Sequence, residues 1–233
     1  AAQFGFLPLI AGTLWVSLFA ILFALPFGLS VSIYMSEVAN PKVRSWLKPI
    51  IELLSGIPSV VYGFFGLIVI VPLIQKLFDL PVGESGLAGS IVLAIMALPT
   101  IITVTEDAMR NCPRAMREAS LALGASQWQT IYKVVIPYSI SGITSGVVLG
   151  IGRAIGETMA VLMVTGNAAV IPTTILEPLR TIPATIAAEL GEAPAGGPHY
   201  QALFMLGVVL FFITLIINFS VEYISSKGLK RSK

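Results

Sequence analysis

Arg153 and Glu157 lie four residues apart in an otherwise apolar stretch, GIGRAIGETMAVLMVTGN, which runs from Gly150 to Asn167. Arg153 follows Pro137 by 16 residues, which is about 24 Å at the helical rise of ~1.5 Å per residue. A charge at such a depth in a spanning helix costs roughly 2.5–3.5 kcal/mol on insertion scales. A guanidinium offers a planar fork of donors that matches a tetrahedral oxyanion, and the glutamate can orient that fork or accept a proton. The pair therefore predicts a path for an anion, with a purely structural ion pair as the alternative.

The composition indicates which elements must position these charges. Hydrophobic residues make up 56% of the 233 residues and charged residues only 11%, against about 25% charged residues in soluble domains. A bilayer core of ~30 Å needs about 20 apolar residues in a helix. The sequence therefore predicts an all-α fold, a polytopic transmembrane helix bundle that forms one domain over residues 1–233. We expect five spans, at residues 7–35, 48–76, 86–109, 136–165 and 199–224.

The second of these spans contains residues that favour a break. Glu52 lies near its start, and Gly56, Pro58 and Ser59 follow within two helical turns. Broken helices are tolerated at membrane depth where protein or a wet cavity satisfies the freed backbone groups. We expect these four residues to form part of a path or a hinge, and for Glu52 an interfacial position is the alternative.

Several kinds of site have no residues to build them. The chain holds one Cys and one His, too few for a zinc-type ligand set, and His199 next to Pro198 is a poor candidate for the base of a nucleophile. No G-x-x-x-x-G-K-[ST] phosphate loop is present. We therefore predict no catalytic residue, no metal site and no cofactor bound by this chain.

The placement of basic residues predicts the orientation. Lys and Arg gather after the first, third and fifth spans, whereas the connections after the second and fourth hold only Lys76 and Arg180. The positive-inside rule makes the first group cytoplasmic, so the C-terminus and the connection 110–135 lie inside and loop 166–198 lies outside. An N-terminus on the outer side must be translocated across the membrane, so we expect a sixth span or a secretory signal upstream.

The connection 110–135 is predicted to form a short amphipathic helix between Pro113 and Gly124. Proline suits a helix start and glycine a helix stop. Met116, Ala119 and Leu123 form an apolar stripe between them.

Three motifs, in order along the chain, resemble those of a known family. Glu118-Ala119-Ser120, three residues, Gly124, nine residues and Val134-Val135-Ile136-Pro137 are similar to the EAA-x3-G-x9-I-x-L-P loop of binding-protein-dependent ABC importer permeases. The departures are conservative. ELLSGIPSVVYGFFG and GRAIGETMAVLMVTGN look like the phosphate-specific permeases of that family, and more like the PstC-type than the PstA-type subunit.

This resemblance implies a function and partners. The chain would be the permease subunit of an ATP-driven importer of inorganic phosphate in the cytoplasmic (inner) membrane of a prokaryote, as a multi-pass, six-span protein. Its partners would be a homologous PstA-type subunit, an ABC ATPase dimer that uses ATP and Mg, and a periplasmic phosphate-binding protein that touches loop 166–198; no nucleic acid is expected. We call residues 110–135 the coupling segment, because the resemblance implies that its helix docks on the ATPase. The implied site residues are, for the substrate path, Arg153, Glu157 and Thr158, and for ATPase coupling, Arg114, Arg117, Glu118, Ala119, Gly124 and Ala125.

Other classes of protein remain as alternatives. A permease for sulfate or molybdate would need the same chemistry, because both are tetrahedral oxyanions. A transporter or channel without ATP would favour internal repeats and further ion-coupling groups in the spans, and a membrane enzyme would need a nucleophile with a base. Neither pattern is present in the sequence.

Overall fold

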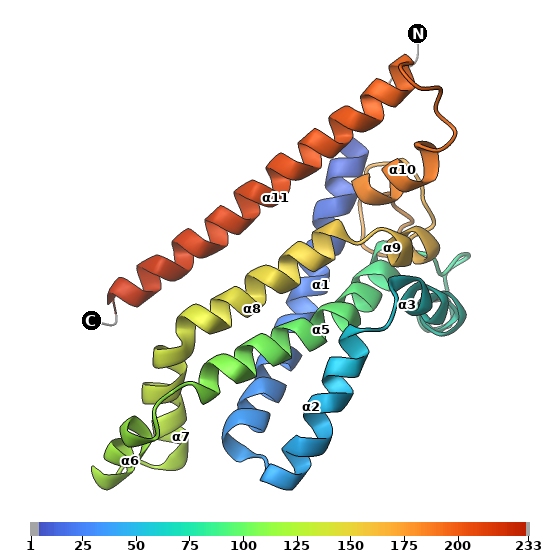
Figure 1. Ribbon diagram of the computed structural model, residues 1–233. Helices are drawn as coiled ribbons and strands as arrows, with labels where there is room; N and C mark the ends of the chain where they lie inside the picture. Colours follow the sequence, from blue (N-terminus) through green and yellow to red (C-terminus); the bar gives the residue numbers. More distant parts are fainter. Residues whose placement is uncertain (1–4, 232–233) are drawn as a thin grey trace. The chain divides into compact units, whose positions relative to one another are not determined.

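The computed structural model describes residues 5–231, with the side chains described as far as Tyr223. The basic residues after Tyr223 that entered the orientation argument lie outside the described side chains. Throughout the described part the chain is helical, apart from connecting loops and one isolated bridge (Figure 1). The helices are α1 (Leu7–Ile33), α2 (Pro41–Ser55), α3 (Ser59–Phe65), α4 (Val71–Leu77), α5 (Gly86–Arg110), α6 (Arg114–Ala122), α7 (Gln127–Thr130), α8 (Ile136–Gly156), α9 (Met159–Val164), α10 (Ile182–Glu189) and α11 (Pro198–Arg231), with π-helical turns η1 (Tyr34–Val38), η2 (Gly66–Ile70) and η3 (Ile131–Val135).

Within residues 5–231, five continuous helical stretches are long and apolar enough to cross a membrane, as predicted from the sequence. Each has a mean hydropathy of at least 1.7 over its best window. The first, third and fifth agree closely with the expected spans. The five stretches are Leu7–Val38, Ser59–Leu77, Gly86–Arg110, Gln127–Gly156 and Pro198–Tyr223.

The second span differs from the prediction at its start. The expected span 48–76 is interrupted by a turn at Gly56–Ile57, and Pro58 is the N-cap residue of α3. Proline lacks the N–H that a continuing helix would need and disfavours helical backbone in the residue before it. Residues 41–55 therefore form a separate helix, α2, and the span begins at Ser59.

The fourth span differs at its end. The prediction of one helix over 136–165 is wrong, because α8 ends at Gly156 and the six-residue α9 begins at Met159. Glycines at 152 and 156 lower helix propensity in the last turns. The break falls on Glu157 and Thr158, two residues of the predicted path.

Two compact units divide the chain, and α1, α5, α8 and α11 contribute residues to both. Unit 1 comprises residues 1–24, 57–97 and 151–216, and unit 2 comprises residues 25–56, 98–150 and 217–233.

Close packing of α3, α5 and α9 forms the core of unit 1. A Cβ atom at Gly63 would lie 2.9 Å from the Cα of Ala160, and one at Gly66 would lie 2.6 Å from Cγ2 of Val92. Glycine is required at both positions because the neighbouring helix occupies the space of a side chain. Val16 of α1 and Leu179 of loop 166–198 complete this core, and both are buried.

Glycines recur at every fourth position of α8, at Gly142, Gly146 and Gly150, and unit 2 packs α8 against α5 through the first two residues of this stripe. A Cβ atom at Gly142 would lie 2.3 Å from that of Ala108, and one at Gly146 would lie 2.9 Å from Oγ1 of Thr105. Small residues at every fourth position let helices approach closely. The stripe is thus a packing surface at these two positions.

Candidate functional site

The break between α8 and α9 places the predicted path residues on non-helical backbone. Because α8 ends at Gly156, Arg153 and Glu157 are not four residues apart on one helix. Glu157 Oε1 instead accepts a hydrogen bond from the backbone N–H of Ala160, at 3.4 Å. Thr158 Oγ1 donates to the carbonyl oxygen of Gly156, at 3.3 Å. Both side chains satisfy backbone groups that the interrupted helix leaves unpaired.

Arg153 lies in the last turn of α8 and is half-buried. Gly152 and Gly156 on either side of it have nothing within 4 Å of an added Cβ position. Open space therefore borders the end of α8 at this charge, unlike the closely packed glycines of the same helix in unit 2.

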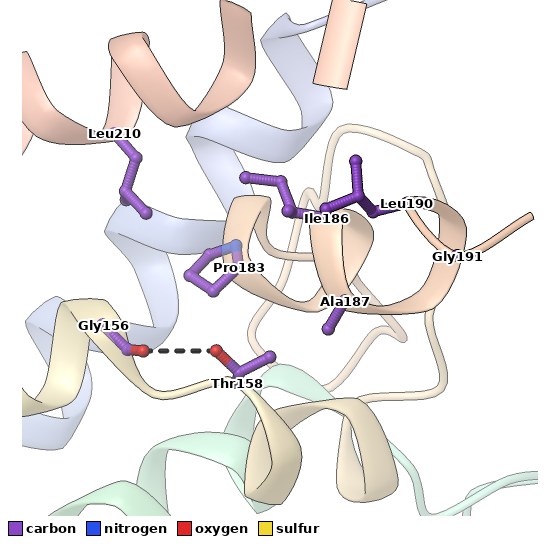
Figure 2. Close-up of a pocket in the computed structure, with 8 residues that line it drawn as sticks. All are labelled: Gly156, Thr158, Pro183, Ile186, Ala187, Leu190, Gly191 and Leu210. Atoms are coloured by element: carbon purple, nitrogen blue, oxygen red, sulfur yellow. Dashed lines mark hydrogen bonds between the residues drawn. The ribbon is translucent and has the colours of Figure 1, made fainter. Parts of the chain in front are cut away.

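A cavity of about 430 Å³ adjoins the break (Figure 2). It lies between the α8–α9 connection, α10 and α11, and its wall is mostly apolar. Thr158 is the one predicted path residue in that wall; Arg153 and Glu157 lie outside it. The lining residues are Gly156, Thr158, Pro183, Ile186, Ala187, Leu190, Gly191 and Leu210.

Helix α10 lies within loop 166–198, and hydrogen bonds and ion pairs hold it in place. Thr181 accepts a hydrogen bond from Ala184 N as its N-cap residue, and Thr13 Oγ1 accepts one from Ile182 N at 2.9 Å. Glu189 at its end contacts Arg180 at 2.7 Å and His199 at 3.2 Å. The wall of the cavity is thus built on an anchored element.

The four predicted path or hinge residues flank the turn between α2 and α3. Glu52 lies on α2 and is exposed, and Gly56 caps that helix. Pro58 and Ser59 begin α3. The four residues lie at or near this break in the helix, and their part in a path or a hinge stays a prediction.

The coupling segment has the predicted helix between Pro113 and Gly124. Gly124 has φ +83° and nothing near its Cβ position, so its role is conformational. A capping box of Ser126 and Gln129 begins α7. The predicted coupling residues divide by exposure: Arg114, Glu118, Ala119 and Gly124 are exposed, Ala125 is half-buried, and Arg117 points into unit 2.

Two ion-pair clusters in unit 2 were missed from the sequence. In the first, Glu37 at the end of α1 pairs with Arg117 at 2.9 Å. In the second, Glu106 of α5 is fully buried and contacts Arg44 Nε at 2.7 Å and Lys48 Nζ at 3.0 Å. The signal was a carboxylate within the last turns of an apolar span, together with basic residues on a helix elsewhere in the chain.

Lys48 also contacts Asp107, and the pKa of its ammonium group is raised. Burial alone would lower the pKa of Lys48, but the hydrogen bonds to Asp107 and Glu106 and their charges outweigh it and raise that pKa. This lysine is therefore charged wherever unit 2 is folded near neutral pH.

Comparisons with known proteins agree with this architecture. Residues 24–228 match the family described as binding-protein-dependent transport system inner membrane component. Among curated relatives, the probable ABC transporter permease protein YqgH of Bacillus subtilis is 41% identical over 97% of this chain and 73% of its own. The phosphate transport system permease protein PstC of Mesorhizobium japonicum is 38% identical over 95% of this chain and 73% of its own. The phosphate transport system permease protein PstC 1 of Mycobacterium tuberculosis is 36% identical over 99% of this chain and 73% of its own.

Solved structures show the same fold. The MetNI methionine ABC transporter, in an inward-facing conformation, has a chain that superposes with a TM-score of 0.69 at 18% identity, covering 97% of both chains. A chain of a bacterial ABC transporter involved in the import of alginate also superposes with a TM-score of 0.69 at 18% identity, covering 97% of this chain and 80% of the other.

The part of the chain that the structure describes has five helices long and apolar enough to cross a membrane. Together with the match to a family of membrane transport components, they make this chain a multi-pass membrane transport subunit and not an enzyme. More narrowly, the chain belongs to the family of binding-protein-dependent transport system inner membrane components, whose members are the permeases of ABC importers. Permeases of this family work with an ATPase and a binding protein.

Proposed function

We propose that this chain is a permease subunit of an importer that carries inorganic phosphate across the cytoplasmic membrane at the expense of ATP. The observation that carries the proposal is the identity of 36–38% to proteins named PstC, over more than nine-tenths of the chain. The sequence contains no phosphate loop for ATP. A separate ATPase dimer would therefore supply the energy, and a homologous PstA-type subunit and a phosphate-binding protein would complete the importer.

Arg153 would be the anion contact of the path, with Thr158 at the adjoining cavity. Support comes from its half-buried position and from the open space at Gly152 and Gly156. A guanidinium binds a phosphate oxyanion through parallel N–H groups. Glu157 would support the path by ordering the turn after α8, because its carboxylate accepts a hydrogen bond from Ala160 N.

The orientation would place the coupling segment and the C-terminus in the cytoplasm. Only three of the 14 Lys and Arg residues fall in the sequence ranges of unit 1: Lys76, Arg153 and Arg180. Positive charge marks cytoplasmic connections. Loop 166–198 would then face the binding protein.

Ligand-stimulated ATPase activity of the reconstituted complex tests the substrate. Phosphate, sulfate and molybdate would be supplied in parallel, each with the binding protein of the same system. Stimulation by phosphate supports the proposal, and stimulation by sulfate or molybdate alone would replace it with another oxyanion.

The Arg153→Gln variant tests the path. We expect uptake to fall by a factor of roughly 30 or more, since removing a charged partner from a desolvated ion contact costs about 2–5 kcal/mol. Lys76→Gln is the matched control, because it removes one positive charge from an exposed position of unit 1. Normal uptake by an assembled Arg153→Gln complex would contradict this role.

A further inference from the structure

Arg117 is the one arginine of α6 that points into the protein. Its Nη2 lies 2.9 Å from Oε1 of Glu37 and donates a second hydrogen bond to the carbonyl oxygen of Met109, at 2.8 Å. Glu37 belongs to η1 at the end of α1, and Met109 to the last turn of α5. A single side chain of α6 thus holds the ends of two membrane spans.

Glu37 also contacts α7, the second helix of the coupling segment. Gln127 Nε2, at the start of α7, donates to the backbone carbonyl oxygen of Glu37 at 3.1 Å. Ser36 Oγ donates to its carboxylate at 2.7 Å. Within the coupling segment, the hydroxyl groups of Ser120 and Thr130 lie 2.9 Å apart. Both helices of the segment therefore converge on one residue.

The environment makes this contact strong. The Glu37 side chain is only 8% exposed and that of Arg117 24%. Charge-assisted hydrogen bonds are roughly twice as strong as neutral ones, and removing one partner leaves an uncompensated buried charge. Arg114, by contrast, is exposed on the same helix.

A second buried cluster extends the connection. Glu106 of α5 contacts Arg44 and Lys48 of α2 at 2.7 and 3.0 Å, three residues before Met109. The end of α1, α2, the end of α5 and α6 are thus joined in unit 2 by two neighbouring groups of ion pairs.

We infer that Arg117 is a positioning residue that fixes α6 to the ends of α1 and α5, so that a displacement of α6 by a partner moves those two spans. Arg117 then acts in coupling from inside the permease, and the exposed residues of α6 remain available for docking. The inference rests on the proposed function as an ATP-driven importer.

The first test measures transport and ATP hydrolysis in the whole complex in proteoliposomes. In Arg117→Gln and in Glu37→Gln, we expect complexes that still hydrolyse ATP but import about tenfold less substrate per ATP, within the range typical of coupling between distant sites. The charge-exchanged variant Arg117→Glu/Glu37→Arg should recover most of that ratio, because it restores the pair. Lys42→Gln, an exposed charge of α2 in the same unit and outside the coupling segment, is the control.

The second test needs no substrate, so it separates this inference from the proposed function. Spin labels at cysteines replacing Val38 and Leu121, in a Cys112→Ala background, report the distance between the end of α1 and α6. We expect the same distance with and without bound ATP in the parent complex, and a nucleotide-dependent change in Arg117→Gln.

Three results would overturn the inference. One is a substrate-to-ATP ratio in Arg117→Gln equal to that of the parent. Another is a distance from α1 to α6 that changes on ATP binding while Arg117 is present. The third is a charge-exchanged variant as defective as the single variants, which would assign Arg117 to docking on the ATPase instead.

Discussion

At the scale of single residues, the break after α8 changes what Glu157 does. The sequence pattern paired it with Arg153 on one helix, whereas its carboxylate accepts a hydrogen bond from Ala160 N and stabilises the start of α9. We expect Glu157→Gln, which keeps an acceptor oxygen, to reduce uptake less than Glu157→Ala, since losing a cap costs typically ~1 kcal/mol. Uptake assays on complexes matched for assembly check this order. Equal losses in the two variants would show that the negative charge is required.

Glu177 in loop 166–198 gives a pH prediction. Hydrogen bonds from the hydroxyl and backbone N–H of Thr173, at 2.6 and 2.8 Å, lower the pKa of its carboxyl group. A carboxylate with a lowered pKa stabilises the folded loop above its ordinary pKa and loses that contribution as the pH falls through the lowered value. We expect Thr173→Val to return the pKa toward the ordinary value of 4.5. Carbon NMR of the carboxyl group during acid titration measures it, with Thr174→Val as a comparison.

At the scale of elements, the contact of α3 with α9 holds the site in place. A Cβ atom at Gly63 would meet Ala160 Cα and Met163 Sδ, both at 2.9 Å. Gly63→Ala therefore forces the two helices apart at a cost of roughly 1–3 kcal/mol, the usual range for overpacking. Gly207→Ala on α11 is the control, because nothing lies within 4 Å of its added Cβ. Thermal unfolding in detergent should show a lower midpoint for the first variant alone.

The same scale shows where sequence reasoning succeeds. Apolar length predicts the five spans, and proline and glycine predict α6 and the break at Gly56 and Pro58. The break at Glu157 was not predicted, because no proline marks it and the apolar stretch continues on both sides of it. The Glu37–Arg117 pair joins residues 80 positions apart, so a local pattern cannot reveal it.

At the scale of the whole molecule, the orientation can be tested directly. In a Cys112→Ala background, a cysteine replacing Leu123, which is 89% exposed, should react with a membrane-impermeant maleimide only when the cytoplasmic face is accessible. A cysteine replacing Val170 in loop 166–198 should react from the opposite side. The two variants control each other, and reversed labelling would invert the proposed topology.

The left-handed backbone at Gly124 has a consequence for natural and engineered variation. Since the space around its Cβ position is empty, tolerance there should not follow side-chain volume. A saturation library should instead rank substitutions by how readily each amino acid adopts positive φ, with asparagine and aspartate least harmful and valine and isoleucine most harmful. Large side chains would be tolerated at this turn as long as the residue can adopt a positive φ.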